Sequence, residues 1–240
     1  ISGIILPMLP HKNLIPDINL TPYSIWLATV VVSGISYLSY LLKRYVFHES
    51  GTLVSGIIGG LYSSTATISV LARKSRKASE QEATDYVAAM LLAVSMMFLR
   101  FMILILIFSR EIFLSIYPYL LTMAVVAAIV AWFIHSRQKR PEDQPAETEE
   151  DDSSNPLEFK VALIFAVLFV IFTFLTHYTL VYAGTGGLNL LSFVSGFSDI
   201  TPFILNLLQN TGSVAALIIT ACSMQAIISN IMVNMFYALF

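Results

Sequence analysis

The sequence predicts an all-α protein that crosses a lipid bilayer several times. Of its 240 residues, 57% are hydrophobic and only 12% are charged, and the mean hydropathy is +0.78. Soluble domains carry about 25% charged residues, so this composition is typical of a polytopic membrane protein. Five apolar runs reach the length of about 20 residues that a helix needs to cross the hydrocarbon core. Two further stretches are long enough but unusually polar.

The expected elements follow one another from the N-terminus. Residues 1–10 (ISGIILPMLP) read like the end of a helix, without an initiator Met or the basic start of a signal peptide. We therefore expect the sequence to be a fragment whose missing N-terminal region holds part of the function. An interfacial loop is expected as far as Asp17. Spanning helices bounded by turn or charge signals are then predicted at residues 23–45, 86–108, 113–134, 159–182 and 214–240.

One long hydrophilic segment divides the chain into halves. It opens with basic residues and continues as PEDQPAETEEDDSSNP. Such a Pro- and acid-rich composition cannot build a core, so residues 137–155 are predicted to form a disordered acidic linker. The predicted organisation is one membrane domain, with a first helical repeat and a connecting helix at 1–136 and a second repeat at 156–240.

Two polar stretches resemble each other, GGLYSSTATI in the first half and SGFSDITPFI in the second. Aligning Gly60 with Gly196 places Ser63 opposite Asp199. Polar residues of this kind are costly in hydrocarbon unless they face protein or water. Two interrupted segments in corresponding halves are a sequence pointer to a transport site. Close helix packing through small residues is the alternative interpretation.

We expect each polar stretch, at residues 51–72 and 186–209, to be a re-entrant hairpin or a discontinuous helix. Gly59 and Gly60 each weaken the first helix by about 1 kcal/mol relative to Ala. Pro202 lacks a backbone donor and is expected to kink or break the second stretch. Each predicted repeat therefore has three segments, of which the middle one is broken or re-entrant.

The conformation of these stretches decides the topology. If both cross the membrane, the chain has seven spans and parallel repeats. If both are re-entrant, it has five spans and inverted repeats, which many secondary transporters share. The positive-inside rule slightly favours five spans, because Lys43 and Arg44 then join the other basic loops. The basic loops 73–77 and 137–140 are predicted to be cytoplasmic, in a bacterial inner membrane.

Two charged residues lie inside predicted membrane segments. Arg100 sits within AVSMMFLRFMILIL, where a charge costs at least about 2.5–3.5 kcal/mol. Asp199 is the one acid in an apolar-flanked segment of the second half. We predict that Arg100 and Asp199 face a shared polar cavity in which they could pair. The alternative is that Arg100 snorkels to an interface.

Hydroxyl and amide side chains complete the candidate site. Ser63, Ser64 and Thr65 could coordinate a dehydrated ion or bind a solute, or they could bond to their own helix carbonyls. Asn230 and Asn234 share one helix face and could line the cavity or fasten helices at roughly 0.6 kcal/mol per bond. The predicted substrate- or ion-binding residues are Ser63, Ser64, Thr65, Arg100, Asp199, Thr201 and Asn230. The predicted break or close-packing residues are Gly59, Gly60, Gly196 and Pro202.

Several function classes find no support in the sequence. Asp199 lacks a second membrane carboxylate for paired-acid catalysis, and no Ser-His motif is present, so we expect no enzyme. Gly184-Thr185-Gly186-Gly187 lacks the Lys of a phosphate loop and is predicted to be a turn. The single Cys222 and the scattered histidines give no Cys/His metal motif, and we expect no cofactor and no nucleic acid partner.

The motifs also resemble a known membrane domain. Residues 56–73 read GIIGGLYSSTATISVLAR after a helix with SGISYLSYLL, and the chain also contains LPMLP, FVSGFSDITPF and SNIMVN. Together they resemble the C-terminal membrane domain of unknown function found in bacterial MgtC/SapB-type proteins, over most of the chain. The resemblance singles out Gly60, Ser63, Ser64, Thr65, Arg100, Gly196, Asp199 and Asn230. The chain departs from that pattern at Thr201, where relatives tend to have a second acid, and at Asn234, where they tend to have Lys.

The leading functional hypothesis is a bacterial inner-membrane transporter or channel for a small ion or solute. Its site would lie near the bilayer midplane, where the two polar stretches meet. The alternative is a regulatory or assembly subunit that binds another membrane protein and transports nothing. The expected partners are the lipid bilayer and the small ion or solute, with a homodimer or another membrane protein as a further candidate, because small-residue faces also serve association.

Overall fold

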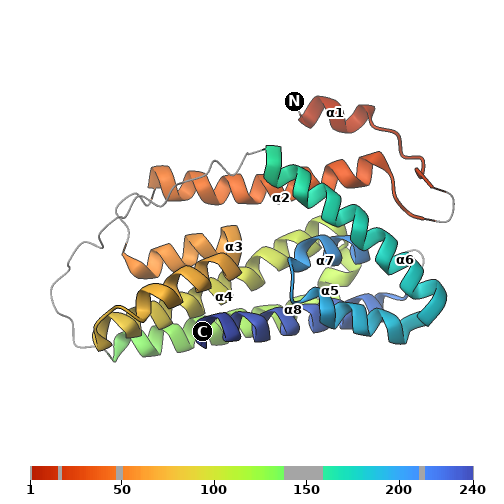
Figure 1. The fold of residues 1–240 in the computed structure, drawn as a ribbon. Helices are drawn as coiled ribbons and strands as arrows, with labels where there is room; N and C mark the ends of the chain where they lie inside the picture. Colours follow the sequence, from red (N-terminus) through yellow and green to blue (C-terminus); the bar gives the residue numbers. More distant parts are fainter. Residues whose placement is uncertain (1, 16–17, 47–50, 138–158, 211–213, 240) are drawn as a thin grey trace. The chain divides into compact units, whose positions relative to one another are not determined.

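The described part of the chain is helical. The computed structural model describes residues 2–15, 18–46, 51–137, 159–210 and 214–239. These residues form helices, turns and one isolated bridge between Ile15 and Ile18, without a β-strand among them (Figure 1). The predicted all-α fold class is confirmed.

The helices follow the predicted apolar runs. They are α1 (Ser2–Met8), α2 (Pro22–Leu41), the π-helical turn η1 (Leu42–Val46), α3 (Thr52–Ser75), α4 (Glu80–Phe108), α5 (Arg110–Ser136), α6 (Phe159–Ser195), α7 (Ile200–Gln209) and α8 (Ala216–Leu239). Six of those described, namely α2, α3, α4, α5, α6 and α8, are long and apolar enough to cross a membrane by length and composition. Large side chains such as Trp132, Tyr182 and Leu217 are 68%, 83% and 80% exposed, as expected of surfaces that face lipid. The chain is a multi-pass helical membrane protein.

The chain divides into two compact units. Unit 1 comprises Ile1–Gly34, Leu104–Ile116 and Leu157–Val233, and unit 2 comprises Ile35–Ile103, Tyr117–Pro156 and Asn234–Phe240. The predicted boundaries at 136 and 156 stay a prediction. Of the predicted acidic linker, residues 138–155 lie outside the described part of the chain.

In unit 2, α3 is interrupted at its centre. Ser63 has φ −157° and ψ 105°, an extended conformation that separates a first α3 limb (52–62) from a second α3 limb (64–75). A Cβ atom added to Gly59 would lie 2.5 Å from Thr67 Oγ1, whereas residues eight apart in a straight helix are separated by about 12 Å. The second limb therefore folds back toward the first (Figure 1). Residues 51–72 are therefore discontinuous at Ser63, and their predicted role as the middle segment of a repeat stays a prediction.

In unit 1, α6 is interrupted at Gly184. This residue has φ 59° and ψ −151°, and it separates a first α6 limb (159–183) from a second α6 limb (185–195). The second limb turns back sharply, and α7 then packs against α6 (Figure 1). The predicted turn is present at Gly184, although Gly186 and Gly187 are already helical.

The second polar stretch is therefore two short helices joined by a turn at residues 196–199. The interruption does not fall at Pro202, which lies in the first turn of α7. A proline is tolerated there because the first backbone N–H groups of a helix have no intrahelical acceptor.

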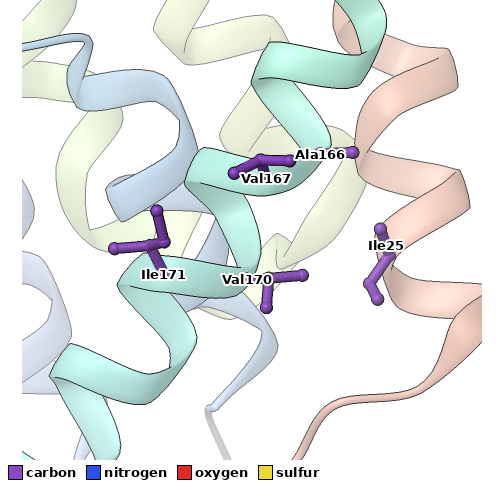
Figure 2. Close-up of a pocket in the computed structure, with 5 residues that line it drawn as sticks. All are labelled: Ile25, Ala166, Val167, Val170 and Ile171. Carbon is purple, nitrogen blue, oxygen red and sulfur yellow. The ribbon is translucent and has the colours of Figure 1, made fainter.

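An apolar groove lies beside the first α6 limb. It has a volume of about 250 Å³ and is lined by Ile25 of α2 and by Ala166, Val167, Val170 and Ile171 of α6 (Figure 2). Every lining side chain is a hydrocarbon, and acyl chains solvate such surfaces as well as other side chains do. This wall of unit 1 is suited to lipid contact.

Replacing Gly184 with Ala is expected to lower the melting temperature. The φ and ψ values of Gly184 lie in a region that is essentially restricted to glycine. Any other residue in this conformation lowers the free energy of unfolding by about 1–3 kcal/mol. Nothing lies within 4 Å of a Cβ atom at this position, so the loss is conformational and not steric. The measurement is thermal unfolding of the purified chain in detergent.

Gly186→Ala is the matched control for that prediction. Gly186 also has open space around an added Cβ atom but lies in helical conformation, so Ala should leave it unchanged or stabilise it by about 0.5–1 kcal/mol. Equal melting temperatures for the two variants would contradict a glycine-specific break at 184.

Candidate functional site

The break in α3 gathers the hydroxyl residues predicted in the first half. Ser63 is the N-cap of the second α3 limb, and its Oγ accepts a hydrogen bond from the Ala66 backbone N–H at 3.4 Å. Ser64 is buried, and Ser63 and Thr65 are half-buried. Serine is a favoured N-cap because its oxygen satisfies an N–H that lacks an intrahelical acceptor. The hydroxyls therefore mark the start of a half-helix.

Residues near the middle of α4 hold this break. A Cβ atom on Gly60 would lie 2.5 Å from Ala93 Cα, so the two backbones approach as closely as only glycine permits. Arg100 Nη1 donates a hydrogen bond to the Tyr62 carbonyl at 2.8 Å. That carbonyl ends the first α3 limb, where helical acceptors lose their partners. Arg100 thus places a positive charge at the break.

The turn in unit 1 holds the corresponding residues of the second half. Asp199 is the N-cap of α7, and its Oδ1 accepts a hydrogen bond from the Thr201 backbone N–H at 2.9 Å. Its carboxylate is exposed and lies at the positive end of the α7 dipole. Thr201 is buried at 2% exposure. Asp199 therefore places a negative charge at this turn.

Residues near the middle of α8 hold the turn in unit 1. Ser229 Oγ donates a hydrogen bond to the Phe193 carbonyl at 2.7 Å, and Asn230 Nδ2 donates one to the Gly196 carbonyl at 3.1 Å. A Cβ atom on Gly196 would overlap Ser229 and lie 2.8 Å from the Asn230 backbone nitrogen. These bonds satisfy carbonyls at the end of the second α6 limb. Asn230 thus fastens α8 to the turn.

The two breaks occupy corresponding positions in the sequence. Ser63 and Asp199, the two N-caps, are 136 positions apart. The same separation relates the first residues of α4 and α8, Glu80 and Ala216. It also relates the two glycine contacts, Gly60 with Ala93 and Gly196 with Ser229. One alignment therefore superposes caps, helix starts and packing partners.

The half-helices have lengths suited to the depth of a bilayer leaflet. Each limb beside a break has 10 to 12 residues, or about 15–18 Å at 1.5 Å per residue. That is roughly half of the ~30 Å hydrocarbon core. Both breaks also contact the middle of a helix long enough to cross it, α4 in unit 2 and α8 in unit 1.

The structure groups the predicted residues by unit. Unit 2 contains Gly59, Gly60, Ser63, Ser64, Thr65 and Arg100 around the α3 break, and unit 1 contains Gly196, Asp199, Thr201, Pro202 and Asn230 around the α7 turn. The predicted pairing of Arg100 with Asp199 would join the two units, and it stays a prediction.

Sequence reasoning missed the residues that pack against the breaks. Ala93 follows Gly60, and Ser229 follows Gly196, by the same number of residues. The sequence signal that could have identified them is therefore a small residue at matching positions of the two helices that follow the polar stretches. The sequence could not identify the Tyr62 carbonyl as the partner of Arg100, because this carbonyl is free to accept a side-chain hydrogen bond only where the helix is broken. Within the described residues, no group of three His, Cys, Asp or Glu side chains could hold a metal ion.

Comparison with known protein families gives a match over most of the chain. Residues 30–240 match the DUF4010 family, which is described as a domain of unknown function. No curated protein matches the chain, and no solved structure matches it. The match confirms the prediction of a domain of unknown function, whereas the association with MgtC/SapB-type proteins stays a prediction.

Proposed function

The chain belongs to the DUF4010 family, and we propose that it is a transporter or channel for a small ion or solute. One observation carries the proposal: each half contains a polar segment broken at an N-cap, and each break packs against the middle of an apolar helix. Irregular backbone at membrane depth is tolerated where it is buried in protein or lines a water-filled cavity. Broken segments of this kind form the substrate sites of many secondary transporters.

The two breaks offer complementary chemistry. The α3 break combines the hydroxyls of Ser63 and Thr65 with the guanidinium of Arg100. The α7 turn combines the Asp199 carboxylate with the N-terminus of a half-helix. A solute between them would meet a cationic and an anionic wall. This shared site is part of the proposal, as is the association with MgtC/SapB-type proteins.

The half-helix lengths support the five-span topology. On this proposal α2, α4, α5, the first α6 limb and α8 cross the bilayer. Each broken segment enters and leaves the bilayer on the same side, and the two segments enter from opposite sides. Each repeat then crosses twice and α5 crosses once, so the two repeats have inverted orientations in the membrane. The common separation of 136 positions supports two equivalent repeats. A bacterial inner membrane with loops 73–77 and 137–140 in the cytoplasm completes the proposal.

Asp199→Asn is expected to reduce flux about tenfold or more, equivalent to about 1.4 kcal/mol of lost ion or solute stabilisation. Asn is as good an N-cap as Asp, so the helix start is kept while the charge is removed. The measurement is uptake of radiolabelled rubidium, sodium, magnesium and chloride by proteoliposomes that contain the full chain.

Glu111→Gln is the matched control for Asp199→Asn. It removes an exposed carboxylate at the start of α5, outside both breaks, and should leave flux unchanged. Absence of flux for every tested ion, together with stable co-purification of a membrane partner, would favour the alternative of an assembly subunit. Unchanged flux in Asp199→Asn would remove Asp199 from the site.

A further inference from the structure

Unit 1 contains a polar cleft that includes none of the residues at the two breaks. It has a volume of about 420 Å³ and lies where the segment before α2, the end of the first α6 limb and the end of α7 come together. Six of its lining residues are polar: Asn19, Thr173, Thr176, His177, Thr185 and Asn210. Ligand sites typically have volumes of about 300–1,000 Å³ and a few convergent polar groups. The cleft therefore meets the size and composition of a binding site.

One wall of the cleft is a continuous hydrogen-bond chain. Asn19 Nδ2 donates to Asn210 Oδ1 at 3.4 Å, and Asn210 Nδ2 donates to the Asn206 carbonyl at 2.9 Å. Asn206 Nδ2 donates to Thr173 Oγ1 at 2.7 Å, and Thr173 Oγ1 donates to the Phe169 carbonyl at 2.8 Å. These bonds fix the wall, because each side chain is held by its neighbour.

Thr176 lines the same cleft but does not take part in this hydrogen-bond chain. Its side chain is 1% exposed, and its hydroxyl has no hydrogen-bond partner among the described residues. Thr173, one turn earlier on α6, satisfies its hydroxyl on a carbonyl of its own helix, the usual solution for Thr in an apolar helix. A buried hydroxyl without a partner costs about as much as a lost hydrogen bond. A molecule in the cleft would supply the partner.

The lining indicates the class of that molecule. None of the described lining residues is Asp, Glu, Lys or Arg, so within the described part of the chain the cleft offers no carboxylate, ammonium or guanidinium group to an ion. Its volume is that of about a dozen waters at ~30 Å³ each, which is too large for a single dehydrated cation. The cleft also lies at helix ends, beside Asn19 and Asn210. A small uncharged molecule with several hydrogen-bonding groups fits these conditions.

We propose that this cleft binds a small neutral solute that carries hydroxyl or amide groups, with the Thr176 hydroxyl as one of its hydrogen-bond partners. The same chemistry occurs in free polyols and in the glycerol of a lipid headgroup. The proposal is independent of the transport site, because its residues and its test do not involve Ser63, Arg100 or Asp199.

The test is a titration of the full chain in phosphatidylcholine nanodiscs. The melting temperature of the protein is measured at each probe concentration. The probes are erythritol and acetamide, with sodium and potassium chloride as ionic comparators. We expect saturable stabilisation by a neutral probe, and Thr176→Val should weaken its apparent affinity about fivefold, the effect of one hydrogen bond. Competition by phosphatidylglycerol in the nanodisc would assign the site to a headgroup glycerol, and its absence would assign it to a free solute.

Matched variants keep the result interpretable. Thr176→Ser retains the hydroxyl and should bind like the wild type, and Thr122→Val removes an exposed hydroxyl of α5 and should also bind normally. If Thr176→Val does not fold, Thr185→Ala at the exposed rim replaces it with the same expected loss. A linear stabilisation that is equal in all variants is a general osmolyte effect and overturns the proposal, as does saturation by the salts alone.

Discussion

Arg100→Met is expected to abolish flux while leaving the protein folded. Two terms in the stability oppose each other. Removing the guanidinium leaves the Tyr62 carbonyl without the bond that Arg100 donates at 2.8 Å, a loss of about 1.5–3 kcal/mol for a charged donor. Removing a charge from an apolar helix saves about 2.5–3.5 kcal/mol. The net change in unfolding free energy is therefore small, and a loss of flux reports on the site.

Flux and melting temperature, measured on the same preparation, test the prediction for Arg100. Arg100→Lys keeps the charge but not the reach and planarity of the guanidinium, so it should recover part of the flux. Arg110→Met, at the exposed start of α5, removes a charge outside the breaks and should retain full flux. Full flux in Arg100→Met would mean that the side chain only fastens α3 to α4 or snorkels to the membrane surface.

The fold class followed from hydropathy because long apolar helices are the dominant signal in a membrane protein. The ends of the helices were predicted less accurately than the fold class. The second span was predicted to start at residue 86, whereas α4 starts at Glu80. Its start is set by a capping box, in which Ser79 N–H donates to Glu82 Oε2 at 2.9 Å and Glu82 N–H donates to Ser79 Oγ at 3.4 Å. Such a cap is polar, so a hydropathy window does not detect it.

The candidate site, which stays a prediction, was inferred from the similarity of two segments and not from either segment alone. Alignment of Gly60 with Gly196 placed Ser63 opposite Asp199, and both are N-caps in the structure. Nothing local distinguishes Ser63 from Ser64 as the point of the break. The choice depends on tertiary packing, since Gly60 must meet Ala93 and the Tyr62 carbonyl must meet Arg100. A single sequence does not contain that information.

The cleft around Thr176 was missed for a related reason. In the sequence, Thr176 is one hydroxyl in an apolar run, and most such residues bond to their own helix. Its hydroxyl becomes notable only because the hydrogen-bond chain from Asn19 to Thr173 passes beside it without reaching it.

Gly60→Ala is expected to destabilise the protein, although Ala is the better helix former. The added Cβ atom would lie 2.5 Å from Ala93 Cα and 2.6 Å from the Ala93 carbonyl oxygen. Both are backbone atoms that cannot rotate away, so α3 and α4 must separate. Overpacking of this kind costs about 1–3 kcal/mol, against about 0.5–1 kcal/mol gained in helix propensity.

The same substitution at Gly34 should have the opposite sign. Gly34 lies in α2 with nothing within 4 Å of an added Cβ atom, so only the gain in propensity remains. Thermal unfolding in detergent measures both variants, and each kcal/mol corresponds to about 2–4 °C for a chain of this size. Gly196→Ala should behave like Gly60→Ala, because its Cβ would overlap Ser229. If Gly60→Ala and Gly196→Ala are instead as stable as Gly34→Ala, the breaks are not held against α4 and α8, and the proposed site loses its structural basis.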